Sequence, residues 1–151
     1  MREFPHHYTA SAAGSPDGDL RLDSERLPEL RSAAPAEFDG PGDRWSPETL
    51  LTAAVADCFV LTFRATAKFS RLPWLTLTCH ASGTLDRVDR VTQFTGFALK
   101  ASLRVPAGTD VEQARRLLAR AEQGCLISNS LKGRVALEAE VTVDQETQAA
   151  A

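Results

Sequence analysis

One long apolar stretch, residues 46–68, limits the folds open to this chain more than any other feature. Ser46 can accept a hydrogen bond from a free backbone N–H at a helix start, and Pro47 suits the first helical position. Between residues 50 and 67 polar residues are few, and apolar ones fall on nearly every face of a helix. At roughly 1.5 Å per residue the helix would be about 34 Å long. The stretch 46–68 therefore predicts a long central helix buried in a core.

The region before this helix has the pattern of a small antiparallel sheet. Residues 6–12 and 19–23 alternate between apolar and polar, and the glycine- and proline-containing run 14–18 between them favours a turn. Residues 30–34 add a short third strand. A loop over 35–43, with two prolines and two glycines, then leads to the helix.

The region after the helix alternates with a period of two over two long segments. Residues 75–85 and 91–105 therefore predict a hairpin of long strands, with its turn at 86–90. Helical spacing then predicts a second helix over 111–121, and residues 134–143 form a final strand. The order β-β-β-α-β-β-α-β indicates an α+β fold with a mainly antiparallel sheet.

Length and composition favour a soluble globular protein of one domain. The 151 residues suffice for a core without disulfides, and we expect one domain over 1–144 followed by a disordered tail at 145–151. A net charge of -3 gives no electrostatic reason to expect a nucleic-acid or membrane partner. No secretory signal is visible, and the apolar run 50–63 is too short for a confident membrane span. The expected location is the cytoplasm.

The predicted central helix is apolar on more sides than one sheet and one amphipathic helix can cover. The uncovered apolar side would stay in contact with water in a monomer. We therefore expect a homodimer in which a second subunit covers this side.

Three cysteines are present, and two of them stand in unusual settings. Cys58 lies within the apolar helix, and Cys125 follows a glycine that ends the second helix, just before Ser128 and Asn129. A helix thiol with a distant turn thiol is what a peroxidase with a resolving cysteine requires. The alternative is that both are small core residues, since free cysteine is among the most buried residue types. Ser128 and Asn129 are expected to shape the turn by side-chain to backbone hydrogen bonds.

The remaining candidates for chemistry have simpler explanations. Cys79 falls on the apolar face of a predicted strand and is expected to serve core packing. His6, His7 and His80 lack partners at metal-ligand spacing, so no metal is expected.

Two segments resemble the motifs of a known family. SPETLLTAAVADCF (46–59) is similar to the NPExLxAAxxxACF signature of the osmotically inducible protein C and organic hydroperoxide resistance (OsmC/Ohr) family, and CLISNSL (125–131) is similar to its second-cysteine segment. The interval of ten residues from Glu48 to Cys58 also matches. The order of predicted elements agrees as well, so the chain is identified as a member of the family, in its OsmC-like subgroup.

The resemblance implies an OsmC-like fold, an intertwined homodimer and active sites at the subunit interface. It implies that Cys58 is the peroxidatic thiol and Cys125 the resolving thiol of a peroxiredoxin-like enzyme that reduces organic hydroperoxides. The two would form a disulfide that an external dithiol, such as a lipoyl group or a lipoylated protein, reduces again. No bound cofactor is implied.

A thiolate in an apolar helix needs a cation nearby, because desolvation raises a thiol's pKa. In the family an arginine of the N-terminal hairpin supplies it, held by the glutamate that matches Glu48. Asp19 stands here where that arginine is usual, so Arg21, on the same strand face, becomes the first candidate and Arg44 the second. Arg21 can equally be a solvated surface residue. Glu48 also has a simpler explanation, because a carboxylate in the first turn of a helix interacts favourably with the positive end of the helix dipole.

The sequence thus favours an antioxidant enzyme of the oxidative stress response, a thiol-dependent peroxidase for organic hydroperoxides. The absence of an arginine from its usual position in the hairpin turn leaves an alternative open. That alternative is a non-enzymatic protein of the same fold that binds an apolar ligand, or a redox sensor of the stress response.

Overall fold

The structure, a computed structural model, describes residues 1–145 and divides into two compact units, Met1–Leu50 and the part that begins at Leu51. The order of long elements is the predicted β-β-β-α-β-β-α-β, and the α+β class is confirmed. A single domain over 1–144 stays a prediction. The tail predicted at 145–151 lies, from residue 146 on, outside the described residues.

The first unit holds a small antiparallel sheet in the order β1-β2-β3, formed by Ser11–Ala13, Leu20–Asp23 and Leu30–Ser32. The strand predicted over 6–12 begins only at Ser11, where β2 starts to offer pairing partners, and residues 1–10 are exposed. A short 3-10 helix, Ala36–Phe38, follows in the predicted loop.

The central helix α1 runs from Pro47 to Phe69, close to the predicted limits. Its start is fixed by a reciprocal pair of hydrogen bonds. The N–H of Thr49 donates to Ser46 Oγ at 3.2 Å, and the N–H of Ser46 donates to Thr49 Oγ1 at 2.8 Å. Both bonds satisfy donors that a helix start would otherwise leave without a partner.

Burial of α1 within the single chain is confined to one stripe. Val55, Phe59, Phe63 and Ala67 follow at intervals of four residues and are fully buried. On other sides Leu61 is 48% exposed. By length and hydropathy α1 could cross a membrane, but core helices of soluble proteins pass the same test, so this is weak evidence.

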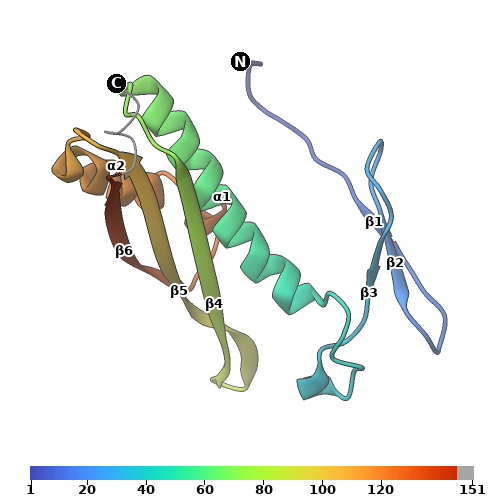
Figure 1. The fold of residues 1–151 in the computed structure, drawn as a ribbon. Coiled ribbons are helices and arrows are strands. Elements are labelled where there is room, and N and C mark those ends of the chain that lie inside the picture. Colours follow the sequence, from blue (N-terminus) through green and yellow to red (C-terminus); the bar gives the residue numbers. More distant parts are fainter. Residues whose placement is uncertain (146–151) are drawn as a thin grey trace. The chain divides into compact units, whose positions relative to one another are not determined.

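The second unit contains a sheet in the order β4-β5-β6, formed by Thr76–Val88, Val91–Pro106 and Arg134–Asp144 (Figure 1). The β4–β5 hairpin turns at Asp89 and Arg90, both with positive φ, and so is tighter than the predicted turn over 86–90. Strand β6 pairs with β5 in parallel, which the sequence pattern did not predict. A parallel pairing needs a long crossover, and α2, Val111–Gln123, supplies it.

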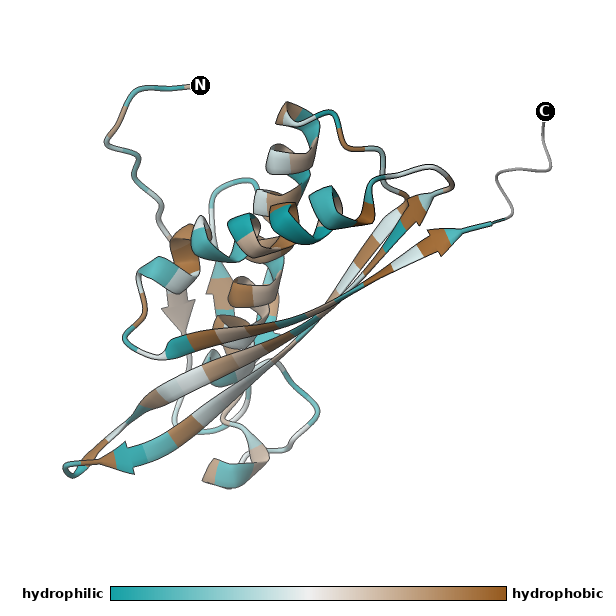
Figure 2. Cartoon of the chain, turned by 90° about the vertical axis from the view of Figure 1, so that its left-hand side faces the viewer, coloured by the Kyte–Doolittle hydropathy of each residue, from teal (hydrophilic) through white to brown (hydrophobic). Residues whose placement is uncertain are grey.

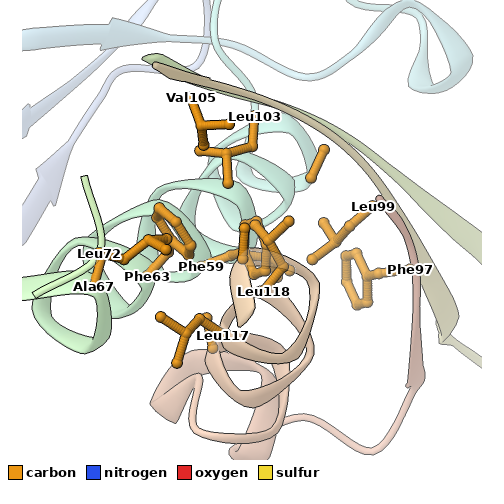
Figure 3. Close-up of a cluster of buried hydrophobic side chains, with 14 residues drawn as sticks. Phe59, Phe63, Ala67, Leu72, Phe97, Leu99, Leu103, Val105, Leu117 and Leu118 are labelled. Atoms are coloured by element: carbon orange, nitrogen blue, oxygen red, sulfur yellow. The ribbon is translucent and has the colours of Figure 1, made fainter. Parts of the chain in front are cut away.

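The hydrophobic core of the second unit lies between this sheet and the two helices (Figure 3). Alternation along the long strands, visible as bands in Figure 2, places one face of the sheet in the core. Asp110 caps the start of helix α2, and its Oδ1 accepts a hydrogen bond from the N–H of Gln113 at 3.0 Å. The fully or almost fully buried core residues are Val55, Phe59, Phe63, Ala67, Leu72, Phe97, Leu99, Ala101, Leu103, Val105, Ala114, Leu117, Leu118 and Ala121.

Phe63 offers a direct test of this core. Its ring is fully buried and meets Trp74 edge to face, with 5.6 Å between ring centroids. Phe63→Ala is expected to lower the free energy of unfolding by about 3–5 kcal/mol, because it removes aromatic contacts and leaves a cavity. Thermal unfolding followed by circular dichroism should show a fall in Tm of about 10 °C. Phe4→Ala, at a ring 81% exposed, is the control and should change stability by less than about 0.5 kcal/mol; equal effects would contradict the assigned core.

Candidate active site

Cys58 lies on the buried side of α1, next to Phe59, and is 9% exposed. Its sulfur lies 3.9 Å from Thr62 Oγ1, one helical turn further on. The same hydroxyl donates to the Cys58 carbonyl oxygen at 2.7 Å, so Thr62 is held in place beside the sulfur. Residues four apart on a helix are neighbours, so the sequence could have predicted that Thr62 lies beside Cys58.

Cys125 lies where α2 ends and a short helix, α3 (Leu126–Asn129), begins. Gly124 follows α2, and its N–H donates to the Arg120 carbonyl at 3.0 Å. The Cys125 side chain is fully buried. Its sulfur accepts a hydrogen bond from the Ser128 hydroxyl at 3.2 Å.

The structure brings Cys58 and Cys125 together. The Thr62 methyl lies 3.6 Å from the point that a Cβ on Gly124 would occupy, so the turn packs against α1 one residue before Cys125. The pKa of the Cys125 thiol is raised, mainly by burial, and the side-chain hydrogen bond and charge interaction with Cys58 act in the same direction. Ser128 opposes this shift. The two cysteines are 67 residues apart in sequence, so only the fold could establish their contact.

The third thiol belongs to the same neighbourhood. Cys79 on β4 packs against the core cluster, as its strand position predicts. Burial raises its pKa to about 11, and a charge interaction with Cys125 contributes. Periodicity alone gave no sign that Cys79 lies near Cys125.

Polar side chains of the Cys125 turn differ in part from the expectation. Asn129 Nδ2 donates to the Gln123 carbonyl at 3.1 Å, a side-chain to backbone bond of the predicted kind. The Ser128 hydroxyl instead donates to sulfur, which corrects the expectation that it bonds to the backbone. The reason is local geometry: a residue three positions after Cys125 in a helical turn faces back toward it.

The candidate cationic residues lie in the first unit, in ion pairs with its own carboxylates. Arg21 Nε lies 3.3 Å from Asp23 Oδ2 and 3.5 Å from Glu29 Oε2. Arg44 Nε lies 2.9 Å from Asp19 Oδ2, and this hydrogen bond is the main reason that the pKa of Arg44 is raised.

Two further observations concern the sequence candidates in this unit. Asp19 and Arg21 line one open depression beside Gly14, as expected for residues two apart on a strand. Glu48 is half-buried in the first turn of α1. The catalytic roles expected for Arg21 and Glu48 stay predictions.

Residues 1–145 contain no cluster of three or more His, Cys, Asp and Glu side chains placed to hold an ion.

Comparison with known proteins identifies the family of this chain. The family model described as OsmC-like protein matches residues 40–146. An uncharacterised Bacillus subtilis protein, YmaD, is 30% identical over 72% of this chain and 75% of its own. An organic hydroperoxide resistance protein of Xanthomonas axonopodis pv. citri is 27% identical over 83% and 87%.

Solved structures give the same result. A crystal structure from Legionella pneumophila, described as an organic hydroperoxide resistance protein OsmC, superposes with a TM-score of 0.72 at 27% identity. It covers 93% of this chain and 100% of its own. A motif pair, a matching family model and a shared fold thus converge, and the chain belongs to the OsmC/Ohr family.

Proposed function

We propose that this protein is a thiol-dependent peroxidase that reduces organic hydroperoxides to alcohols. One observation carries the proposal: two buried thiols from distant segments, Cys58 and Cys125, lie within interacting range of each other. A peroxidatic cysteine needs such a partner to convert its sulfenic acid into a reducible disulfide. Relatives named organic hydroperoxide resistance protein support the substrate class.

The proposed reaction has three steps. The Cys58 thiolate attacks the distal peroxide oxygen, the O–O bond breaks, and the alkoxide leaves as the alcohol after taking a proton. Cys58 is then a sulfenic acid, and the Cys125 sulfur displaces its oxygen as water to form the Cys58–Cys125 disulfide. An external dithiol, which we propose is lipoyl-type or carried by a lipoylated protein, supplies two electrons and two protons to restore both thiols.

Positive charge would favour the Cys58 thiolate over the thiol. We assign this task to Arg21, with Glu48 as the carboxylate that orients it, following the family motif. Since Arg21 is paired with Asp23 and Glu29, it has to exchange these partners to act. Apolar groups around Cys58, such as Phe59, favour alkyl and fatty-acyl hydroperoxides over hydrogen peroxide.

The proposal includes a homodimer. Helix α1 is apolar on most sides, yet a single chain buries only one stripe of it. A second copy would cover the exposed apolar side, which includes Leu61.

Light scattering during gel filtration should therefore give twice the 16.4 kDa chain mass at micromolar concentration. Leu61→Glu should shift the protein toward monomer, because it places a charge on the covered side. Arg116→Glu, on the exposed side of α2, is the control and should leave the dimer intact. A wild-type monomer would contradict the dimer.

The enzymatic proposal is tested by incubating the protein with cumene hydroperoxide and dihydrolipoamide. We expect stoichiometric conversion to the alcohol, and slower consumption of hydrogen peroxide. The proposal would be refuted if the protein consumed no alkyl hydroperoxide in the presence of any dithiol.

The expected location of the protein is the cytoplasm, where a reducing environment keeps the resting cysteines as thiols.

A second candidate function is a non-enzymatic one, in which the protein binds an apolar ligand or senses peroxide. The observation that favours it is the pairing of Arg21 and Arg44 with carboxylates of their own unit. Alkylation of Cys58 across pH separates the two. A thiol pKa well below ~8.5 indicates catalysis, and a thiol that resists alkylation at every pH indicates packing.

A further inference from the structure

The Ser128 hydroxyl makes an unusual contact for a buried serine. Its Oγ lies 3.2 Å from Cys125 Sγ and donates a hydrogen bond to the sulfur. Ser128 is 8% exposed and Cys125 is fully buried, so water has little access to this bond. A hydrogen bond donated to sulfur is weak while the sulfur is a thiol, and it becomes charge-assisted when the sulfur is a thiolate.

Neighbouring side chains of the same turn do not share this property. Asn129 Nδ2 donates to the Gln123 carbonyl, and Ser130 Oγ donates to the Leu126 carbonyl at 2.7 Å. Both bonds hold the backbone of the turn and leave the sulfur alone. Ser128 thus differs from its neighbours because its hydroxyl donates to the Cys125 sulfur. Ser130, whose hydroxyl donates to a backbone carbonyl, provides a matched control.

We propose that Ser128 is a positioning residue that stabilises the Cys125 thiolate released when the Cys58–Cys125 disulfide is reduced. This inference rests on the proposed function and assigns the direction of its last step. It makes Cys125 the leaving group and Cys58 the sulfur that the external dithiol attacks.

Accessibility gives the same direction. Cys58 is 9% exposed and Cys125 is fully buried, so Cys58 is the more accessible of the two residues to an external thiolate. The attack forms a mixed disulfide between the reductant and Cys58 and breaks the Cys58–Cys125 bond. The electron pair stays on Cys125, whose thiolate later takes a proton. The second thiol of the reductant then displaces Cys58, and the reductant leaves as a disulfide.

Stabilisation of this thiolate matters because its surroundings oppose it. Burial and the Cys58 side chain both disfavour negative charge on Cys125. Among the causes that shift the pKa of Cys125, Ser128 is the one that lowers it, through its hydroxyl and its backbone N–H. A leaving thiol with a lower pKa departs faster in thiol–disulfide exchange.

The first readout is the pKa of Cys125 in the Cys58→Ser, Cys79→Ser background. It is measured from the ultraviolet absorbance of the thiolate as a function of pH. Ser128→Ala should raise this pKa, and Ser128→Thr, which keeps the hydroxyl, should restore it. Ser130→Ala should leave it unchanged. Ser128→Thr and Ser128→Val, whose side chains have the same shape, repeat the comparison if Ser128→Ala folds poorly.

The second readout is the rate at which dithiothreitol reduces protein that diamide has oxidised. We expect Ser128→Ala to slow reduction about threefold for each unit of pKa increase, with a sensitivity of roughly one half. Ser128→Thr and Ser130→Ala should match the wild type.

Diamide forms the disulfide without peroxide, so this experiment separates the two proposals. Equal pKa values and equal reduction rates in all variants would overturn the role of Ser128 and leave the peroxidase proposal standing. Failure of diamide to join Cys58 and Cys125 would overturn both.

Discussion

Cys58→Ser is expected to abolish hydroperoxide reduction, with a loss of at least roughly a thousandfold in kcat/KM. A serine hydroxyl stays protonated at neutral pH and is a far weaker nucleophile toward the O–O bond than a thiolate. The change leaves the fold intact, because serine has almost the same size as cysteine. The measurement is consumption of cumene hydroperoxide with dihydrolipoamide in excess.

Cys79→Ser is the matched control, since it alters a second, partly buried thiol of the same unit. The pKa of Cys79 is about 11, so only roughly 10⁻⁴ of it is thiolate at neutral pH. It should therefore contribute no nucleophile, and the variant should keep nearly full activity. Activity that survives Cys58→Ser but is lost in Cys79→Ser would contradict the assignment.

Cys125→Ser is expected to permit a single oxidation of Cys58 and then stop turnover. Without the second thiol no internal disulfide can form, so the Cys58 sulfenic acid accumulates and excess peroxide drives it on to sulfinic acid. Dimedone labelling with peptide mass spectrometry should detect the sulfenic acid in this variant. In the wild type the same label should be scarce, because Cys125 removes the sulfenic acid first.

The pH dependence of that competition has a defined sign. Burial raises the pKa of Cys125, so near neutrality it is mostly the unreactive thiol. Condensation with the sulfenic acid should accelerate as pH rises toward this raised pKa. Dimedone labelling of the wild type should accordingly decrease with rising pH, and labelling that is equal in wild type and Cys125→Ser at every pH would contradict a resolving role.

Much of the fold could be predicted from local chemistry. The start of α1 depends on the hydrogen bond that the Ser46 side chain accepts from the N–H of Thr49. This is a local interaction, so it does not depend on the rest of the fold. The long strands were equally readable, because a period of two over 91–105 leaves few alternatives. The parallel pairing of β6 with β5 could not be read, because alternation places residues on faces and says nothing of strand direction.

The candidate site was predictable only in part, for a related reason. Motif likeness singled out Cys58 and Cys125, but their contact depends on how the turn at Gly124 packs against Thr62. Ser128 was noticed as a turn residue, yet its bond to sulfur follows from the backbone conformation of α3. Ion pairs of Arg21 and Arg44 depend on hairpin geometry, which no sequence period encodes.

The central claim is that Cys58 and Cys125 work as a redox pair. Its most direct test is to add one equivalent of cumene hydroperoxide to the reduced protein, block remaining thiols and map the cysteines by peptide mass spectrometry. The account predicts a Cys58–Cys125 disulfide, with Cys79 recovered as a free, blocked thiol. Peroxide that leaves all three thiols reduced, or a disulfide that joins Cys79 instead, would contradict it.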